Sequence, residues 1–113
     1  MTVKYLHLRY PKENGVSNRG GATLAYTTLE HSDPSMGLMG DICFNVAWCS
    51  ERDNFSRKIG RAISSNRLKV DGPYDVIEST GSRTKTLIEW AEQNLFTEPC
   101  AIVRAGNHWV IQT

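Results

Sequence analysis

The sequence has little of what usually reveals a function at first reading. It has 113 residues, three cysteines and a net charge of +1. A chain of this length suits one small domain, which we place at residues 1–113. Charge this close to neutral argues against binding of duplex nucleic acid, which normally requires a strong positive excess. No apolar run reaches the length of a membrane span, so we expect no membrane association.

The few cysteines exclude two further classes. Cys43, Cys49 and Cys100 are odd in number and form no CxxC pair, so a disulfide scaffold is not expected. Together with the histidines they also lack metal-ligand spacing, and we predict neither a metal nor a cofactor. The N-terminus has no apolar segment of the signal-peptide type, and a reducing cytoplasm is the expected setting.

A catalytic constellation is also missing. Cys49 precedes an expected helix, where a thiol pKa can be lowered, but a nucleophile needs a base. The three histidines stand in no recognisable relation to Cys49, and no pair of carboxylates suggests acid–base chemistry. We therefore expect Cys49 to be structural and the protein not to be an enzyme.

What is present is an alternation of apolar and polar residues that predicts strands at 3–9, 22–30 and 41–48. Pro-, Asn- and Gly-rich stretches at 11–21 and 31–40 predict loops between them. Residues 100–113 predict a closing hairpin that turns at Gly106 and Asn107. The first three strands are expected to form an antiparallel meander.

Two helices are predicted between the third strand and the hairpin. The first begins at Ser50, with Asp53 in the capping-box position, or slightly further on with Asp53 itself as the cap, and ends before "VDGPYD". Its core-facing stripe is expected to consist of Phe55, Ile59, Ala62 and Ile63. The second lies within 79–96, with an apolar side made of Leu87, Ile88, Ala91 and Leu95. The predicted fold is α+β, a mostly antiparallel sheet of about five strands with two helices packed on one face.

The first helix carries most of the local charge. Between residues 51 and 69, cations exceed carboxylates by four, which is more than the net charge of the whole chain. Arg57 and Arg61 are four residues apart and so are neighbours on the helix surface. Paired guanidinium groups, with Lys58 beside them, match a phosphate in bidentate geometry. A solvated basic face is the alternative, and the sequence leaves both open.

Gly60 and the Gly20–Gly21 pair each admit two interpretations. Gly60 lies in the helix interior, where Gly costs about 1 kcal/mol relative to Ala. Because it has no side chain, it would permit a close approach such as a helix contact in a dimer; the alternative is a tolerated accident. The stretch "NRGGAT" could form an anion-binding concavity with Arg19 and Thr23 as donors, or could be a plain hairpin loop.

The segment "WCSERDNFSRKIGRAISSNRL" resembles a pattern in small phage proteins, C-S-x-x-D-x-F-x-[RK]-K-x-G-R-x-I-A. The matching residues are Cys49, Ser50, Asp53, Phe55, Arg57, Lys58, Gly60, Arg61, Ala62 and Ile63, and Ser64 departs from the final Ala. The pattern is similar to that of the first family of Thoeris anti-defence proteins. The matched segment is about a fifth of the chain.

The resemblance implies a sponge that sequesters cyclic ADP-ribose-type or cyclic oligonucleotide immune signals in the host cytoplasm without cleaving them. An adenine-bearing ligand would need arginines for its phosphates and a stacking plane, for which Trp109 is one candidate and Phe55, unless it is a core residue, the other. A homo-oligomer is expected on separate grounds, because a small domain forms a deep pocket more easily between subunits than within one. Another function left open is that of a phage inhibitor, similar to an anti-CRISPR, whose basic helix binds a host defence protein directly. Titration with cyclic nucleotides would separate the two.

Overall fold

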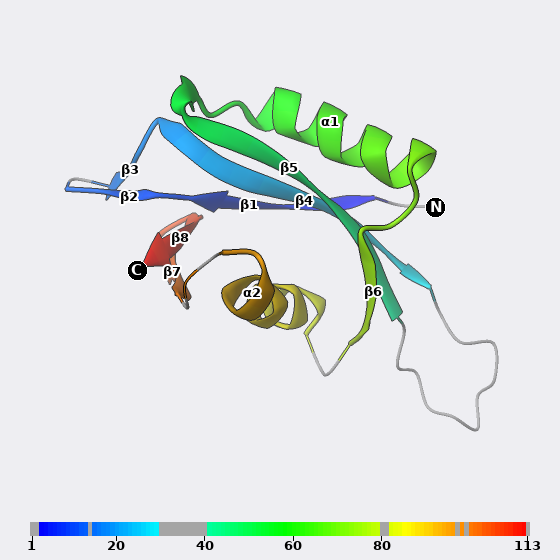
Figure 1. The fold of residues 1–113 in the computed structure, drawn as a ribbon. Coiled ribbons are helices and arrows are strands. Elements are labelled where there is room, and N and C mark those ends of the chain that lie inside the picture. Colours follow the sequence, from blue (N-terminus) through cyan, green and yellow to red (C-terminus); the bar gives the residue numbers. More distant parts are fainter. Residues whose placement is uncertain are drawn as a thin grey trace.

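The computed structural model describes residues 3–13, 15–29, 41–79, 82–96, 98 and 100–112. The fold is α+β, with a curled six-stranded sheet and two helices (Figure 1). The elements, in chain order, are β1 (Lys4–Arg9), β2 (Pro11–Lys12), β3 (Gly15–Val16), β4 (Arg19–Leu29), β5 (Asp41–Asn54), α1 (Arg57–Val70), β6 (Asp75–Glu78), α2 (Arg83–Asn94), β7 (Ala101–Ala105) and β8 (His108–Gln112).

The sheet is mostly antiparallel, as predicted, but it has six strands in the order β6-β5-β4-β1-β8-β7. The β1–β4–β5 meander and the β7–β8 hairpin are confirmed. The two parts are joined by one parallel pairing, in which Leu8 lies opposite Trp109 and Arg9 opposite Val110. Because this pairing is so short, the first half of β1 has no partner on that side among the described strands.

The prediction that both helices lie on one face of the sheet is wrong. Figure 1 shows α1 on one face and α2 on the other. The even-numbered positions of the central strands are apolar and form the main core with α2. In that core, Trp90 of α2 lies edge-on to Phe44, with 4.5 Å between ring centroids. The predicted apolar side of α2 is confirmed: Leu87, Ile88 and Ala91 are buried, and Leu95 packs against the core.

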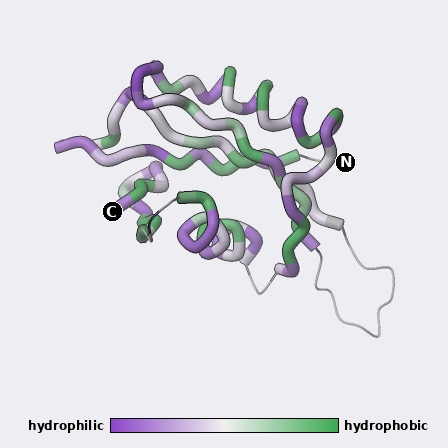
Figure 2. Tube along the Cα trace, in the orientation of Figure 1, coloured by the Kyte–Doolittle hydropathy of each residue, from purple (hydrophilic) through white to green (hydrophobic). Residues whose placement is uncertain are grey.

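The opposite face of the sheet is lined by small and polar side chains, and α1 packs there. These buried residues are Thr23, Ala25, Thr27, Cys43, Asn45 and Ala47. The helix approaches them through Gly60, next to Thr23, and through Ser64, which is fully buried. The predicted stripe is therefore wrong: Ile59 is 60% exposed and Ile63 39% exposed. Figure 2 shows that hydrophobic positions recur along α1 although this helix does not cover the apolar core.

The predicted start of α1 is also wrong, because β5 continues to Asn54. Gly21 of β4 pairs with Cys49 but Arg19 pairs with Asn54, so residues 50–53 form an extended bulge in β5. The helix begins at Arg57, and its N-cap is Ser56, whose Oγ accepts a hydrogen bond from the Ile59 N–H at 3.2 Å.

Three further boundaries differ from expectation. The first loop contains the short β2–β3 pair, and β4 begins at Arg19. The segment before α2 contains β6, which pairs with the first residues of β5. The predicted loop at 31–40 lies outside the described residues, as does Glu30. Neither described helix is long and apolar enough to cross a membrane.

Candidate anion-binding site

The first half of β1, which has no described strand beside it on the β8 side, borders a cleft of about 260 Å³. The start of α1 lies on one side of it, the start of α2 on another, and the tip of the β7–β8 hairpin closes the end. We call it the basic cleft. Its lining residues are Tyr5, Leu6, His7, Arg9, Tyr26, Arg57, Thr84, Arg104, Asn107, His108 and Trp109.

Three arginines from three separate elements line this cleft. Arg9 ends β1, Arg57 begins α1 and Arg104 belongs to β7. No carboxylate is among the described residues that line it. Guanidinium groups remain protonated at neutral pH, so the cleft carries a concentrated positive charge. Such a set of donors suits a phosphate-bearing ligand.

Arg9 is held in place by its surroundings. One terminal nitrogen donates to the Ser17 carbonyl at 2.8 Å, and the guanidinium lies 4.2 Å from the ring centroid of Phe55. Its Nε is buried without a hydrogen-bond partner among the described residues. Burial, and next the charge of Arg57, lower the pKa of Arg9. A bound anion would offset this accumulation of positive charge.

The pKa of His7 is affected by the same arginine charges. Burial, followed by the charges of Arg57, Arg61 and Arg9, lowers its pKa from 6.5 to about 4. The ring is therefore neutral at pH 7. Its Nδ1 is hydrogen-bonded to Thr23 Oγ1 at 2.8 Å, and its edge meets the ring of Phe55. The imidazole is thus fixed between the sheet and the start of α1.

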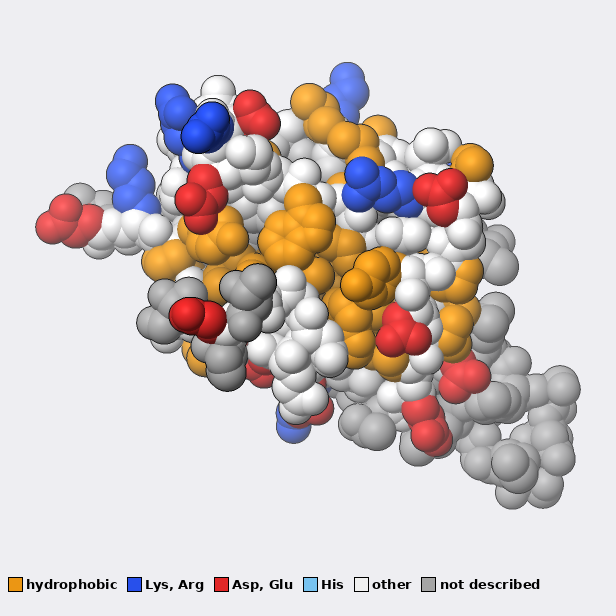
Figure 3. Space-filling model, viewed as in Figure 1, with side chains coloured by type: hydrophobic (Ala, Val, Ile, Leu, Met, Phe, Trp, Pro, Cys, Tyr) orange, Lys and Arg blue, Asp and Glu red, His pale blue; other side chains and the backbone are white. Residues whose placement is uncertain are grey.

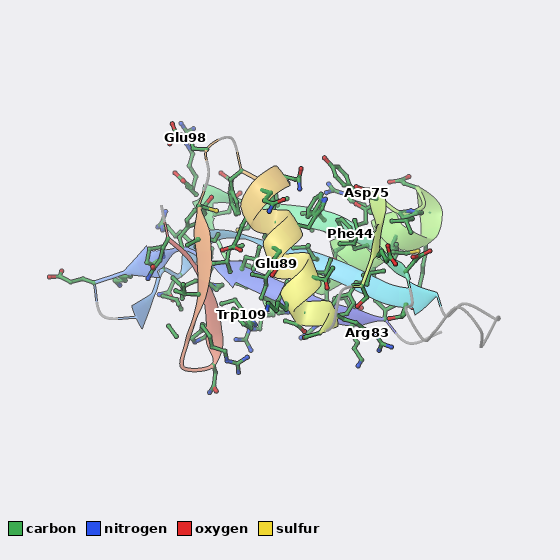
Figure 4. The ribbon with its side chains drawn as sticks, turned by 90° about the horizontal axis from the view of Figure 1, so that it is seen from below. Phe44, Asp75, Arg83, Glu89, Glu98 and Trp109 are labelled. Atoms are coloured by element: carbon green, nitrogen blue, oxygen red, sulfur yellow. The ribbon has the colours of Figure 1, made fainter. Side chains whose placement is uncertain are left out.

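Aromatic side chains complete the walls of the basic cleft. Tyr5 and Tyr26 line it from the strands and Trp109 from β8. Figure 4 shows Trp109 between the β7–β8 hairpin and α2. The Arg104 guanidinium lies 5.3 Å from the centroid of the Trp109 ring. A ligand with a flat base would find a stacking surface beside the cations.

The residues singled out from the sequence fall into three groups. Arg57 and Trp109 line the basic cleft, and Arg61 is near enough to affect His7. Phe55 and Thr23 stand behind it, in contact with His7.

Lys58 and Arg19 lie elsewhere: Lys58 is exposed on α1 outside the lining, and Arg19 donates to the Arg52 carbonyl at 3.2 Å.

The Gly-rich stretch has a packing role in this structure. Gly20 and Gly21 lie within β4 and have positive φ angles of 72° and 128°. A Cβ on Gly21 would overlap the Leu8 carbonyl and meet the Phe55 ring, and one on Gly20 would meet Tyr10. These glycines therefore let two aromatic rings approach the strand. The concavity suggested for "NRGGAT" is occupied by protein side chains.

Sequence reasoning missed Arg9 and Arg104, and with them most of the cleft. The available signal was the alternation in β1, which places Tyr5, His7 and Arg9 on one face of a strand otherwise facing a core. Three polar or aromatic residues in a row on one face indicate a functional or interfacial surface. Nothing local indicated that Arg104 would join them.

No protein-family model, curated protein or solved structure matches the chain. The chemistry of the basic cleft therefore rests on its own residues. Among the described residues, no cluster of three or more His, Cys, Asp or Glu side chains could hold a metal ion.

Proposed function

We propose that the protein binds a small phosphate-bearing nucleotide, of the cyclic ADP-ribose type, in the basic cleft and holds it without cleaving it. The observation that carries this proposal is that Arg9, Arg57 and Arg104 line one cavity and that no carboxylate is among the described residues around it. Arginines bind and orient phosphates but cannot act as bases at neutral pH. Sequestration requires only this, and the aromatic walls supply the surface for a base.

The size of the cleft bears on the assembly. At about 260 Å³ it is slightly smaller than the pockets that usually enclose a drug-sized ligand. One protomer would therefore hold part of a cyclic dinucleotide-sized molecule and leave the remainder exposed. We propose a homo-oligomer in which a second protomer covers that remainder. This arrangement also increases the number of charged contacts per ligand.

The direct test is calorimetric titration with cyclic ADP-ribose, followed by heating and chromatography of the supernatant. A sponge binds the ligand and returns it intact. Arg57→Ala should weaken binding by about thirtyfold or more, because losing one partner of a desolvated charge pair costs about 2–5 kcal/mol. Arg104→Ala should act in the same direction. The melting temperature should change by only a few degrees, because Arg57 is exposed.

Lys58→Ala is the matched control, since it removes one positive charge from the next position of the same helix, outside the cleft. It should leave the affinity within about threefold, the range of screened surface charges. Equal losses in both variants would show a diffuse charge effect and not a site. Absence of binding to any cyclic nucleotide would overturn the proposal and favour the alternative, an inhibitor that binds a host protein.

A further inference from the structure

A second cavity lies on the other flank of α1, toward β5. It has a volume of about 440 Å³ and is bounded by the β5 bulge at 50–53, the first turns of α1 and the adjoining part of β5. We call it the bulge pocket. Its lining residues are Thr23, Ala47, Trp48, Cys49, Ser50, Asp53, Asn54, Phe55, Ser56, Ile59, Gly60 and Ile63.

The bulge that forms one wall is held by specific contacts. The Cys49 thiol lies 3.5–3.6 Å from the carbonyl oxygens of Ser50, Asp53 and Asn54. Ser50 Oγ accepts a hydrogen bond from the Arg52 N–H at 3.2 Å. From outside, the Arg19 guanidinium donates to the Arg52 carbonyl. The wall is thus a built feature of the strand, as bulges next to binding sites commonly are.

The pocket is apolar where it meets solvent. Ile59 is 60% exposed and Ile63 39% exposed, although both line a cavity of ligand size. Trp48 also lines the pocket and is 50% exposed, but its ring packs at a right angle against Phe96, with 5.6 Å between ring centroids. These side chains leave apolar area in water. Figure 3 shows hydrophobic side chains gathered on one face of the molecule, next to α1. Covering this area with a flat apolar group would be favourable.

The one charged side chain in the described lining of the bulge pocket is opposite in sign to the arginines of the basic cleft. Asp53 is the one ionisable carboxylate among its described lining residues, and no lysine, arginine or histidine lines it. No cation among the described residues forms an ion pair with Asp53. The hydroxyls of Ser50 and Ser56 lie in the same lining and can accept further hydrogen bonds. The polar part of this pocket therefore favours a cationic N–H donor.

The two cavities are separated by protein. Phe55 and Thr23 line the bulge pocket, and both contact His7, which lines the basic cleft. A single small ligand would have to pass through this wall to occupy both. The bulge pocket is therefore a separate site with its own ligand.

We propose that the bulge pocket binds an organic cation with a flat apolar body, of the arylalkylamine class. The aromatic body covers Ile59 and Ile63, and the ammonium group faces Asp53. This inference does not depend on the function proposed for the basic cleft, because the two ligands have opposite charge and different walls.

The probe is phenethylamine, compared with 3-phenylpropionate, which has a similar ring and chain but carries a negative charge. Amide and indole N–H chemical shifts are followed by two-dimensional NMR at pH 7. A fragment of this size should bind in the millimolar range. The amine should shift the Trp48 indole and the amides of 50–60. The carboxylate should bind at this site at least about fivefold more weakly.

Asp53→Asn keeps the shape of the side chain and removes its charge, and should weaken the amine about fivefold, as for a partly screened pair. Glu51→Gln is the matched control, because it removes a carboxylate from the same bulge outside the lining. Ile59→Ala should also weaken the amine. Neither Asp53→Asn nor Ile59→Ala should change the affinity of cyclic ADP-ribose, which separates this site from the basic cleft.

Three outcomes would overturn the proposal. Equal binding of amine and carboxylate would show that Asp53 does not select the ligand. Shifts confined to other parts of the chain would place the amine elsewhere. Shifts of Trp48 that depend on protein concentration alone would show that a second copy of the chain covers the pocket.

Discussion

Substitution of Gly60 is the most direct test of how closely α1 packs against the sheet. In the interior of a helix, Gly→Ala normally stabilises a protein by about 1 kcal/mol through backbone entropy. Here we expect the opposite sign. A Cβ at position 60 would overlap Thr23 Oγ1 and lie 3.0 Å from Thr23 Cβ. Gly60→Ala should therefore destabilise the protein.

Thr23 cannot easily move out of the way. It is 1% exposed, and its hydroxyl is fixed by the 2.8 Å hydrogen bond to His7. Overpacking at a rigid buried position costs about 1–3 kcal/mol. After subtraction of the helix-propensity gain, the net loss should be about 0–2 kcal/mol. For a domain of this size, each kcal/mol lowers the melting temperature by about 3–6 °C.

The assay is urea denaturation of four proteins: wild type, Gly60→Ala, Thr23→Ala and the double variant. Thr23→Ala removes the hydroxyl that the new Cβ would meet. In that background the overlap with Oγ1 is gone, but the Cβ at position 23 stays 3.0 Å from the new Cβ, so Gly60→Ala should recover only part of its usual gain of about 1 kcal/mol. The coupling free energy between the two sites should therefore be favourable to the double variant and at most about 3 kcal/mol.

Two results would refute this reasoning. Equal stabilisation by Gly60→Ala in both backgrounds would show that α1 does not approach Thr23. A loss of stability that appears only at high protein concentration would assign Gly60 to a contact between protomers. The structure places its nearest neighbour within the chain, so the effect should be independent of concentration.

Three further predictions concern His7, Cys49 and self-association. The pKa of His7 in the folded protein, about 4, lies below its usual 6.5, so the unfolded chain binds the proton first and the free energy of unfolding should fall as pH decreases from about 6.5 to 4. His7→Asn should flatten this pH dependence, measured by urea denaturation, and an unchanged slope would contradict the lowered pKa. Cys49→Ala should leave the affinity of cyclic ADP-ribose within about twofold, because its thiol is hydrogen-bonded to carbonyl oxygens of the bulge and Cys49 is not among the described residues that line the basic cleft; the loss of a desolvated charged contact, by comparison, costs about 2–5 kcal/mol. Loss of binding in a folded variant would revive a functional thiol. Sedimentation at tens of micromolar, a range where specific dimers normally persist, should show an oligomer, and monomer alone would remove the proposed second wall of the basic cleft.

The parts of the fold that the sequence predicts best are those where one physical signal acts alone. β5 alternates cleanly up to Trp48, and the hairpin has a turn at Gly106, whose φ is 59°. In α2 the apolar side faces the apolar core, so the helical period gives the correct buried residues. In each case the local pattern and the tertiary environment agree.

The buried side of α1 is predicted wrongly because here the local pattern and the tertiary environment disagree. Helical periodicity predicts that its most hydrophobic side faces inward, but the sheet face beneath it is made of small and polar residues. A close contact with such a face requires small residues on the helix, and Gly60 and Ser64 provide it. Periodicity alone cannot show this, because the partner surface is set by strands elsewhere in the chain.

Short strand pairings and irregular backbone also could not be predicted from the sequence. β6 has four residues and exists because it pairs with the start of β5. The bulge at 50–53 follows from the register of β4, whereas its residues, which suit a helix cap, predict a helix start there. The basic cleft depends on the same kind of information. Arg57 was found within a local run of charge, whereas Arg9 and Arg104 meet it only through the order of the strands.

The position of α1 explains why two cavities of opposite chemistry lie so close together. At about 100° per residue, Arg57 and Arg61 lie on one flank of the helix and Ile59 and Ile63 on the other, with Gly60 and Ser64 between them, toward the sheet. The first flank faces the basic cleft and the second the bulge pocket. Because the contact at Gly60 sets how deep the helix lies, Gly60→Ala should change both cavities together. Substitutions on one flank should change only one.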